Sequence, residues 1–193
     1  MAPGVPAAQL GAMGSSGHNE RQLAHLLADH QAAVREFVDR ANALPGERWL
    51  LPRAEGKWTP AQETRHLILF YEALAGDLRN ERQMRVYGTP FKRRIWRWFA
   101  LTQILWRKRI PVAVRAPREA RPEGEDAPRH ELLALFQDRA GQFDDLLAEN
   151  WRQRPDHRVM HPWFGGLTLD HAARLSSVHT RHHAAFLRVP ASS

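Results

Sequence analysis

Apolar side chains recur every three or four residues along most of the chain, and no stretch of useful length alternates as a half-buried strand would. A first helix is predicted over residues 19–44, with leucine, valine and phenylalanine on one face and Pro45-Gly46 directly after it. A second helix is predicted from Pro60 to about residue 86, because Thr59 suits the N-cap position and Gln62 completes a capping box. Its first turns are apolar almost all round, so this helix should be buried on most faces.

Two further long helices are predicted after a basic, aromatic helical segment at residues 91–110. Residues 111–128 are rich in proline, arginine and glutamate and predict a long extended crossover. A helix is then predicted over residues 129–151, and the last helix begins after Thr168, a good N-cap. The pattern therefore predicts an all-α fold: a four-helix bundle with a long crossover and an additional basic-aromatic helical segment.

The composition is that of an ordinary globular domain, with 43% hydrophobic and 25% charged residues in a chain of 193. Cysteine is absent, which excludes disulfides, thiolate metal ligands and a cysteine nucleophile, and fits a cytoplasmic location. No stretch approaches the roughly 20 apolar residues that span a bilayer. Residues 1–17 lack the basic and apolar regions of a secretory signal. We expect them to form a disordered tail before a single domain at residues 18–188.

The net charge of +7 has a local origin. Residues 91–110 hold seven basic residues and no acidic one, while the remaining 21 basic residues are balanced by 21 acidic residues. The favoured interpretation is a bundle helix with one apolar face in the core. That face carries Ile95, Trp98, Phe99, Thr102, Leu105 and Trp106. The alternatives are an interfacial membrane helix, or a site for an anionic ligand or nucleic acid. Nucleic acid is the weakest of these, because no nucleic-acid-binding motif accompanies the segment.

Three histidines could share one metal ion. His179 and His183 are four residues apart, so on a helix their Cβ atoms lie on one face, roughly 6 Å apart. Such a pair is more often exposed or hydrogen-bonded, and a lone His66 in an apolar helix is more often a satisfied core residue. A metal site at the His179/His183 pair needs a third ligand, and a metal-binding His66 needs further ligands, so each supplies what the other lacks. Neighbouring buried imidazoles are also costly unless a metal binds their lone pairs. His182 would point about 100° away, as a neighbour of the site or a surface residue.

Two sets of motifs carry a family resemblance. Trp58-Thr59-Pro60 leading into Arg65-His66-Leu67, and HPWFGGLTLDH leading into HTRHH, resemble motifs of the DinB-like superfamily of small metal-binding helical bundles. The resemblance covers residues 19–187, and residues 111–122 are similar to an extended crossover in a subset of that family. It implies a four-helix bundle whose metal ligands are His66, His179 and His183. It also implies the activities of the family: transfer with a low-molecular-weight thiol, hydrolysis or isomerisation. Histidine ligands suit zinc, nickel, copper and iron alike, and of these divalent transition metals we expect zinc or nickel.

Three neutral ligands would leave the charge and the coordination of a metal ion open, which is typical of a catalytic site. We therefore predict activation of a thiolate or hydroxide for transfer to, or hydrolysis of, a small-molecule substrate. His161 is the candidate catalytic residue, since the His-Pro peptide and Gly165-Gly166 set it in a shaped loop before the last helix. An equally good interpretation is a plug, in which Trp163 and Phe164 close one end of the bundle.

Two alternatives to catalysis stay open. The metal could be structural and clamp the second helix to the last one, since binding to the folded state stabilises it. The chain could also be a non-catalytic, stress-related binding protein whose segment 91–110 contacts a membrane surface or an acidic partner. A homodimer is a further expectation for a bundle of this kind, although the sequence identifies no interface.

Overall fold

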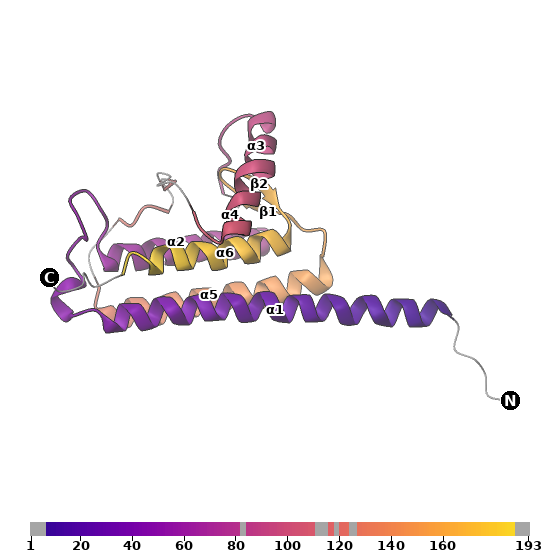
Figure 1. Ribbon diagram of the computed structural model, residues 1–193, viewed down its shortest axis with the longest axis horizontal. Helices are drawn as coiled ribbons and strands as arrows, with labels where there is room; N and C mark the ends of the chain where they lie inside the picture. The colour runs from indigo at the N-terminus through magenta and orange to yellow at the C-terminus, as the bar shows by residue number, and fades with distance from the viewer. Residues whose placement is uncertain (1–6, 82–83, 111–115, 118–119, 124–126, 188–193) are drawn as a thin grey trace.

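The computed structural model describes residues 7–81, 84–110, 116–117, 120–123 and 127–187, with side chains from residue 17 onward. The fold is mostly helical, as predicted. Figure 1 shows four long helices lying lengthwise beside one another: α1 (Ala7–Ala43), α2 (Pro60–Leu78), α5 (Arg129–Gln153) and α6 (Leu169–Ala184). Helix α1 packs chiefly on α6, and α2 packs chiefly on α5. The core therefore lies between two pairs of helices.

Short elements connect the long helices. A 3-10 turn, η1 (Gly46–Arg48), follows α1, and a two-stranded antiparallel hairpin of β1 (Val159–His161) and β2 (Gly165–Leu167) lies between α5 and α6. In the hairpin His161 pairs with Gly165, which has a φ of 68°. Glycine suits this position because it adopts a left-handed conformation without steric cost. The hairpin thus fixes where His161 lies relative to α6.

The predicted helix starts of α2 and α6 are confirmed. Thr59 caps α2 by accepting a hydrogen bond from the Gln62 backbone N–H at 3.1 Å, and the Gln62 side chain accepts one from the Thr59 N–H at 3.0 Å. Thr168 caps α6 by accepting from the His171 N–H at 3.2 Å. These caps satisfy backbone donors that a helix cannot pair internally, so each helix begins at a defined residue.

A buried polar chain crosses the core and takes one side chain from each long helix. His30 Nδ1 of α1 lies 2.6 Å from an Asp144 carboxylate oxygen of α5, and its Nε2 lies 2.7 Å from the Tyr71 hydroxyl of α2. The Tyr71 oxygen lies 2.6 Å from the hydroxyl of Thr180 in α6. One set of protons satisfies every contact: Thr180 donates to Tyr71, Tyr71 to His30, and His30 to Asp144. The sequence analysis did not predict this network.

Two helix boundaries differ from the prediction. Helix α2 ends at Leu78 rather than near residue 86, because Asn80 adopts a left-handed conformation with a φ of 58° that stops the helix. Helix α1 begins at Ala7, so residues 7–17 of the expected disordered tail are helical, while residues 1–6 lie outside the described residues. Extension adds residues to a helix that is already nucleated, so the alanines and Leu10 of this stretch are helical although Gly11 and Gly14 oppose helix. The predicted crossover at 111–128 is described only in short pieces.

Residues 90–107 form a rod that stands out from the long helices (Figure 1). It consists of α3 (Pro90–Trp96), a π-helical stretch η2 (Arg97–Leu101) and α4 (Thr102–Arg107). The favoured placement of its aromatic face in the core is wrong: Trp98 is 78% exposed and Trp106 is 75% exposed. Instead, Leu101 and Ile104 on the other side are buried, and α4 contacts α6. None of the described helices, this rod included, has the length and apolarity needed to cross a membrane.

Candidate metal centre

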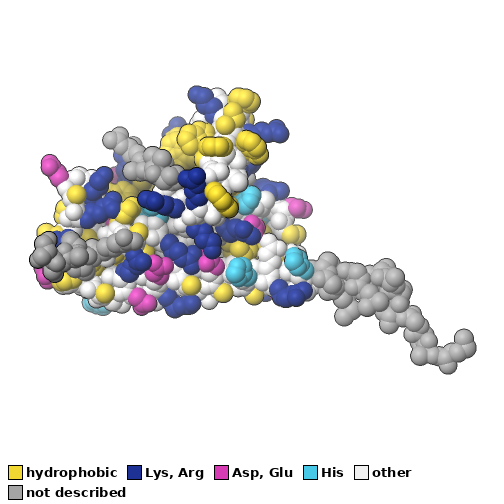
Figure 2. Space-filling model, in the orientation of Figure 1, with side chains coloured by type: hydrophobic (Ala, Val, Ile, Leu, Met, Phe, Trp, Pro, Cys, Tyr) yellow, Lys and Arg dark blue, Asp and Glu magenta, His cyan; other side chains and the backbone are white. Residues whose placement is uncertain are grey.

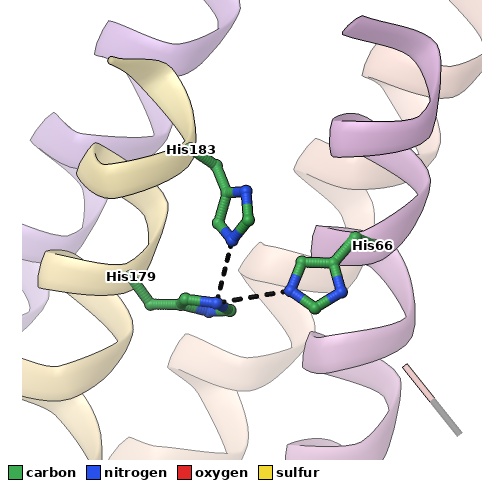
Figure 3. Close-up of side chains that lie close together, drawn as sticks. All are labelled: His66, His179 and His183. Carbon is green, nitrogen blue, oxygen red and sulfur yellow. Dashed lines mark hydrogen bonds between the residues drawn. The ribbon is translucent and has the colours of Figure 1, made fainter. Parts of the chain in front are cut away.

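Helices α2 and α6 bring the three predicted histidines together. His66 projects from α2 and faces His179 and His183 of α6, with the Nε2 atoms of all three rings pointing toward one another (Figure 3). His179 Nε2 lies 3.3 Å from His66 Nε2 and 3.0 Å from His183 Nε2. Ligand atoms held tetrahedrally about 2.0–2.1 Å from one zinc ion are roughly 3.3–3.4 Å apart, so these two distances are close to those between ligands of one ion, and all three nitrogens lie within 4.8 Å of one another.

The hydrogen bonds at the other ring nitrogens fix two of the rings. His66 Nδ1 donates to the backbone carbonyl of Ala120 at 2.5 Å, and His183 Nδ1 donates to a Glu63 carboxylate oxygen at 2.6 Å. A neutral imidazole donates from one nitrogen alone, so Nε2 of His66, and Nε2 of His183 when Glu63 is ionised, present lone pairs to His179. A proton on His179 Nε2 can point at only one of these acceptors. A cation between the three nitrogens resolves the conflict, and the residues therefore fit a divalent metal.

His179 adds a second sign of incomplete pairing. Its Nδ1 atom is buried without a hydrogen-bond partner among the described residues. A buried polar atom without a partner carries a free-energy cost, and in native proteins such atoms are rare and often mark functional sites. The ring also packs against Phe70, with ring centroids 4.4 Å apart.

Burial keeps the triad in the form that binds metals. The pKa of His66 is lowered by burial. The pKa values of His179 and His183 lie well below 6.5 because both rings are buried and neighbouring histidines disfavour a further positive charge. Neutral imidazoles have the free lone pair that coordination needs. Burial also raises the pKa of the Glu63 carboxyl to about 8, which the positive charge of Arg53 opposes, and a cation held by the triad would further favour the ionised carboxylate.

The triad lies in the wall of a cavity of about 520 Å³. Trp58, Phe70 and Trp163 give part of this wall an aromatic surface. Basic side chains also line the cavity, from Arg53, Lys57 and Arg85. The volume is in the range of pockets that bind small molecules, roughly 300–1,000 Å³. Basic residues near a cavity favour anionic groups in the molecule that enters it.

The structure places His161 in the same cavity wall. Its Nδ1 accepts a hydrogen bond from the Trp163 backbone N–H at 3.3 Å, so its proton lies on Nε2. The ring also stacks on buried Phe164 with centroids 4.7 Å apart, and burial lowers its pKa to about 3. At that pKa the ring is a weak base, and its available chemistry is donation of a hydrogen bond from neutral imidazole. The loop therefore lines the cavity with His161, Trp163 and Phe164.

His182 lies beside the triad and outside it. Its ring contacts those of His183 and Phe186, with centroids 5.4 Å and 4.6 Å away, and it lines the cavity. Burial, followed by the positive charge of Arg53, lowers its pKa to about 4. His182 therefore lines the cavity as a neutral imidazole, in addition to His161. The sequence had predicted for it only a place beside the site or on the surface.

The sequence analysis missed two groups that orient the triad. Glu63 lies three residues before His66, a spacing that places both on one face of α2, and this signal could have found it. Its partner is His183, however, and not the histidine on its own helix. The Ala120 carbonyl, 54 residues from His66, has no sequence signal, because every residue has a carbonyl and only the path of the chain selects this one.

These features define a mostly helical protein with a buried histidine triad that could hold a metal ion. Residues 27–187 match the sequence profile of the DinB superfamily, and the chain belongs to that family. Neither the curated proteins nor the solved structures with which the chain was compared include a match. Family membership and the histidine cluster together suggest metal binding, and they assign no reaction.

Proposed function

We propose that the chain is a metal-dependent enzyme built on a DinB-type four-helix bundle, a thiol-dependent transferase or a hydrolase that acts on a small molecule. His66, His179 and His183 would hold a divalent transition metal, zinc or nickel. The observation that carries this proposal is the convergence of the three Nε2 atoms. In His66 and His183 the hydrogen bond at Nδ1 leaves the Nε2 lone pair free for a metal. Three neutral ligands leave open positions at an ion, as catalytic sites do.

Each group of the cavity has a role in this proposal. The bound ion would supply positive charge that favours the deprotonated form of a nearby water or thiol. Glu63 and the Ala120 carbonyl hold the rings of His183 and His66 in the ligand tautomer. Aromatic side chains exclude water from the reacting groups. The His161 Nε2–H would donate a hydrogen bond to the substrate, and the cationic side chains of the cavity favour a substrate with an anionic group.

Elemental analysis of protein purified without an affinity tag tests the site. We expect about one equivalent of metal per chain in the wild type and none in His179→Ala/His183→Ala. His25→Ala/His130→Ala is the matched control, because it removes two exposed histidines that are not part of the triad and should keep the metal. Loaded protein is then assayed for thiol addition to an activated electrophile and for ester hydrolysis. Absence of metal from the wild type after reconstitution would reject the proposal.

A structural metal is the second candidate function, and one observation favours it. Helix α2 packs chiefly on α5, and α6 packs chiefly on α1, so the triad links two helix pairs across the core. A metal clamp at this point would stabilise the fold by binding only the folded state. Chelation would then lower the melting temperature strongly, while the loaded protein would show neither turnover nor ligand binding.

A further inference from the structure

The rod of residues 90–107 and the three residues after it, here called the aromatic limb (residues 90–110), carries a hydrophobic patch. Six of its large apolar side chains are exposed, between 49% and 78% of their surface: Phe91, Ile95, Trp96, Trp98, Phe99 and Trp106. Figure 2 shows hydrophobic side chains gathered at the end of the molecule where α3 stands in Figure 1, with Lys and Arg side chains around them. Single exposed apolar residues are ordinary, but a contiguous patch of this kind marks an interaction surface.

The limb is held firmly by its other side, so the patch is not the result of a loose segment. Leu101 and Ile104 are buried against the rest of the fold, and the Arg97 guanidinium donates to the Gly166 carbonyl of β2 at 2.9 Å. Three residues before the limb begins, the Tyr87 N–H donates to the Pro162 carbonyl of the hairpin loop at 2.8 Å. With the inner face used for packing, the aromatic face is left for a partner.

The charge of the limb restricts what this partner can be. Residues 91–110 contain seven basic side chains and no acidic one. Two of the guanidinium groups bind backbone carbonyls, Arg93 that of Gly88 and Arg97 that of Gly166. Within the described part of the chain, no carboxylate forms an ion pair with any of the seven. The complementary surface is therefore anionic and also accepts apolar rings.

An anionic bilayer surface meets both requirements. Tryptophan rings and the stems of lysine and arginine bury apolar atoms below the headgroups while their polar ends stay in water. A second copy of this chain would bring two basic limbs together and is disfavoured by repulsion. Single-stranded nucleic acid is bound in grooves, whereas the limb projects from the helices as a rod (Figure 1).

We propose that the aromatic limb docks this protein on the surface of anionic membranes, with its tryptophan and phenylalanine rings at the headgroup level. The long helices stay in water, and the chain lies on the bilayer without crossing it. Ile104 and Ile110 of the limb also line the cavity, so docking would hold the candidate metal centre beside the membrane. The inference does not depend on the metal, and the proposed enzyme activity does not depend on docking.

Flotation of the full chain with lipid vesicles tests the proposal. The probes are vesicles of neutral phosphatidylcholine and vesicles with about 30 mol % phosphatidylglycerol, at low salt and at about 0.5 M salt. We expect binding to the anionic vesicles at low salt, and at least about tenfold weaker binding to neutral vesicles or at high salt. Lys92→Gln/Arg94→Gln should weaken binding about fivefold for each lost charge, while Arg21→Gln/Arg35→Gln, two exposed residues of α1, should not.

The aromatic side is tested by Trp98→Ala/Trp106→Ala, whose side chains are too exposed to support the fold. Vesicle binding should fall at least about tenfold, since each buried ring contributes to partitioning. The control is Leu50→Ala/Leu51→Ala, which removes two apolar side chains that are 49% and 47% exposed outside the limb. His179→Ala/His183→Ala should still bind, which separates this test from that of the metal centre. Equal binding by the tryptophan variant, binding to duplex or single-stranded DNA instead of vesicles, or a dimer that this variant abolishes would overturn the proposal.

Discussion

At the scale of single residues, the triad is distinguished by what its rings do away from the metal position. His183 donates from Nδ1 to Glu63, and His66 donates from Nδ1 to a backbone carbonyl. A carboxylate behind a ligating histidine raises the basicity of the ring and fixes its orientation. The Ala120 carbonyl fixes the orientation of the His66 ring in the same way, but it has no net charge and therefore raises the basicity of the ring less. Glu63 should therefore influence metal affinity more strongly than any other residue that is not itself a ligand.

Glu63→Gln tests this role, because glutamine keeps the shape and an acceptor oxygen but removes the charge. We expect metal affinity to fall about 10–100-fold, the usual effect of losing such a partner. The measurement is competition with a chromogenic chelator. Glu72→Gln, on the exposed side of the same helix and paired with Arg139, is the control. Unchanged affinity in Glu63→Gln would remove this carboxylate from the site.

At the scale of elements, the chain from Thr180 through Tyr71 and His30 to Asp144 ties α6, α2, α1 and α5 together. Each contact joins a donor to an acceptor, and the Tyr71 hydroxyl makes two of them, so the network is satisfied only when all four helices are in register. Buried networks of this type specify one packing arrangement, because alternatives leave polar groups without partners. The network also lies close to the site, since Thr180 directly follows the triad residue His179.

Tyr71→Phe removes the central hydroxyl and leaves His30 Nε2 and the Thr180 hydroxyl without that partner. We expect a loss of about 1–3 kcal/mol in the free energy of unfolding, the cost of leaving buried polar groups unpaired. Urea denaturation followed by circular dichroism measures it. Tyr87→Phe, outside the network, should change stability by less than about 0.5 kcal/mol. A Tyr71→Phe protein as stable as the wild type would mean that the network contributes nothing to folding.

At the scale of the whole molecule, a cavity with five neutral histidines in its wall makes stability depend on pH. Burial lowers the pKa of all five, to about 3 for His161 and to about 4 for His182. As the pH falls below the ordinary histidine value of 6.5, the unfolded chain takes up protons that the folded chain refuses. The stabilisation is complete above that value and is lost as the pH falls toward the folded-state pKa values.

The metal-free protein should therefore melt at a clearly lower temperature at about pH 5 than at about pH 7.5. Glu63 and Asp77 act in the opposite direction, because burial raises their pKa, but two carboxyls are outnumbered by five histidines. Scanning calorimetry in the presence of a chelator measures the shift. His161→Gln should reduce the difference in melting temperature between the two pH values. A melting temperature that rises on acidification would contradict a destabilising role of the buried histidines.

The sequence by itself predicted the long helices and the histidines that the fold brings together. Apolar positions recurring at helical spacing predict helices, Thr59 and Thr168 mark where two of them start, and the four-residue spacing of His179 and His183 follows from helix geometry. These signals are local, since each depends on residues within a few turns of one another. The family resemblance, now established over residues 27–187, implied the same three histidines.

Only the tertiary structure decided which groups meet across helices. Glu63 finds His183, 120 residues away, and His30 finds Tyr71 and Asp144, because packing brings distant turns together and no local pattern encodes the match. It also decided the direction of the aromatic limb. Periodicity gives a face to a helix, but whether that face meets a core or water depends on what space the neighbouring elements leave. Here Leu101 and Ile104 pack against the rest of the fold, and the tryptophans of the limb are exposed.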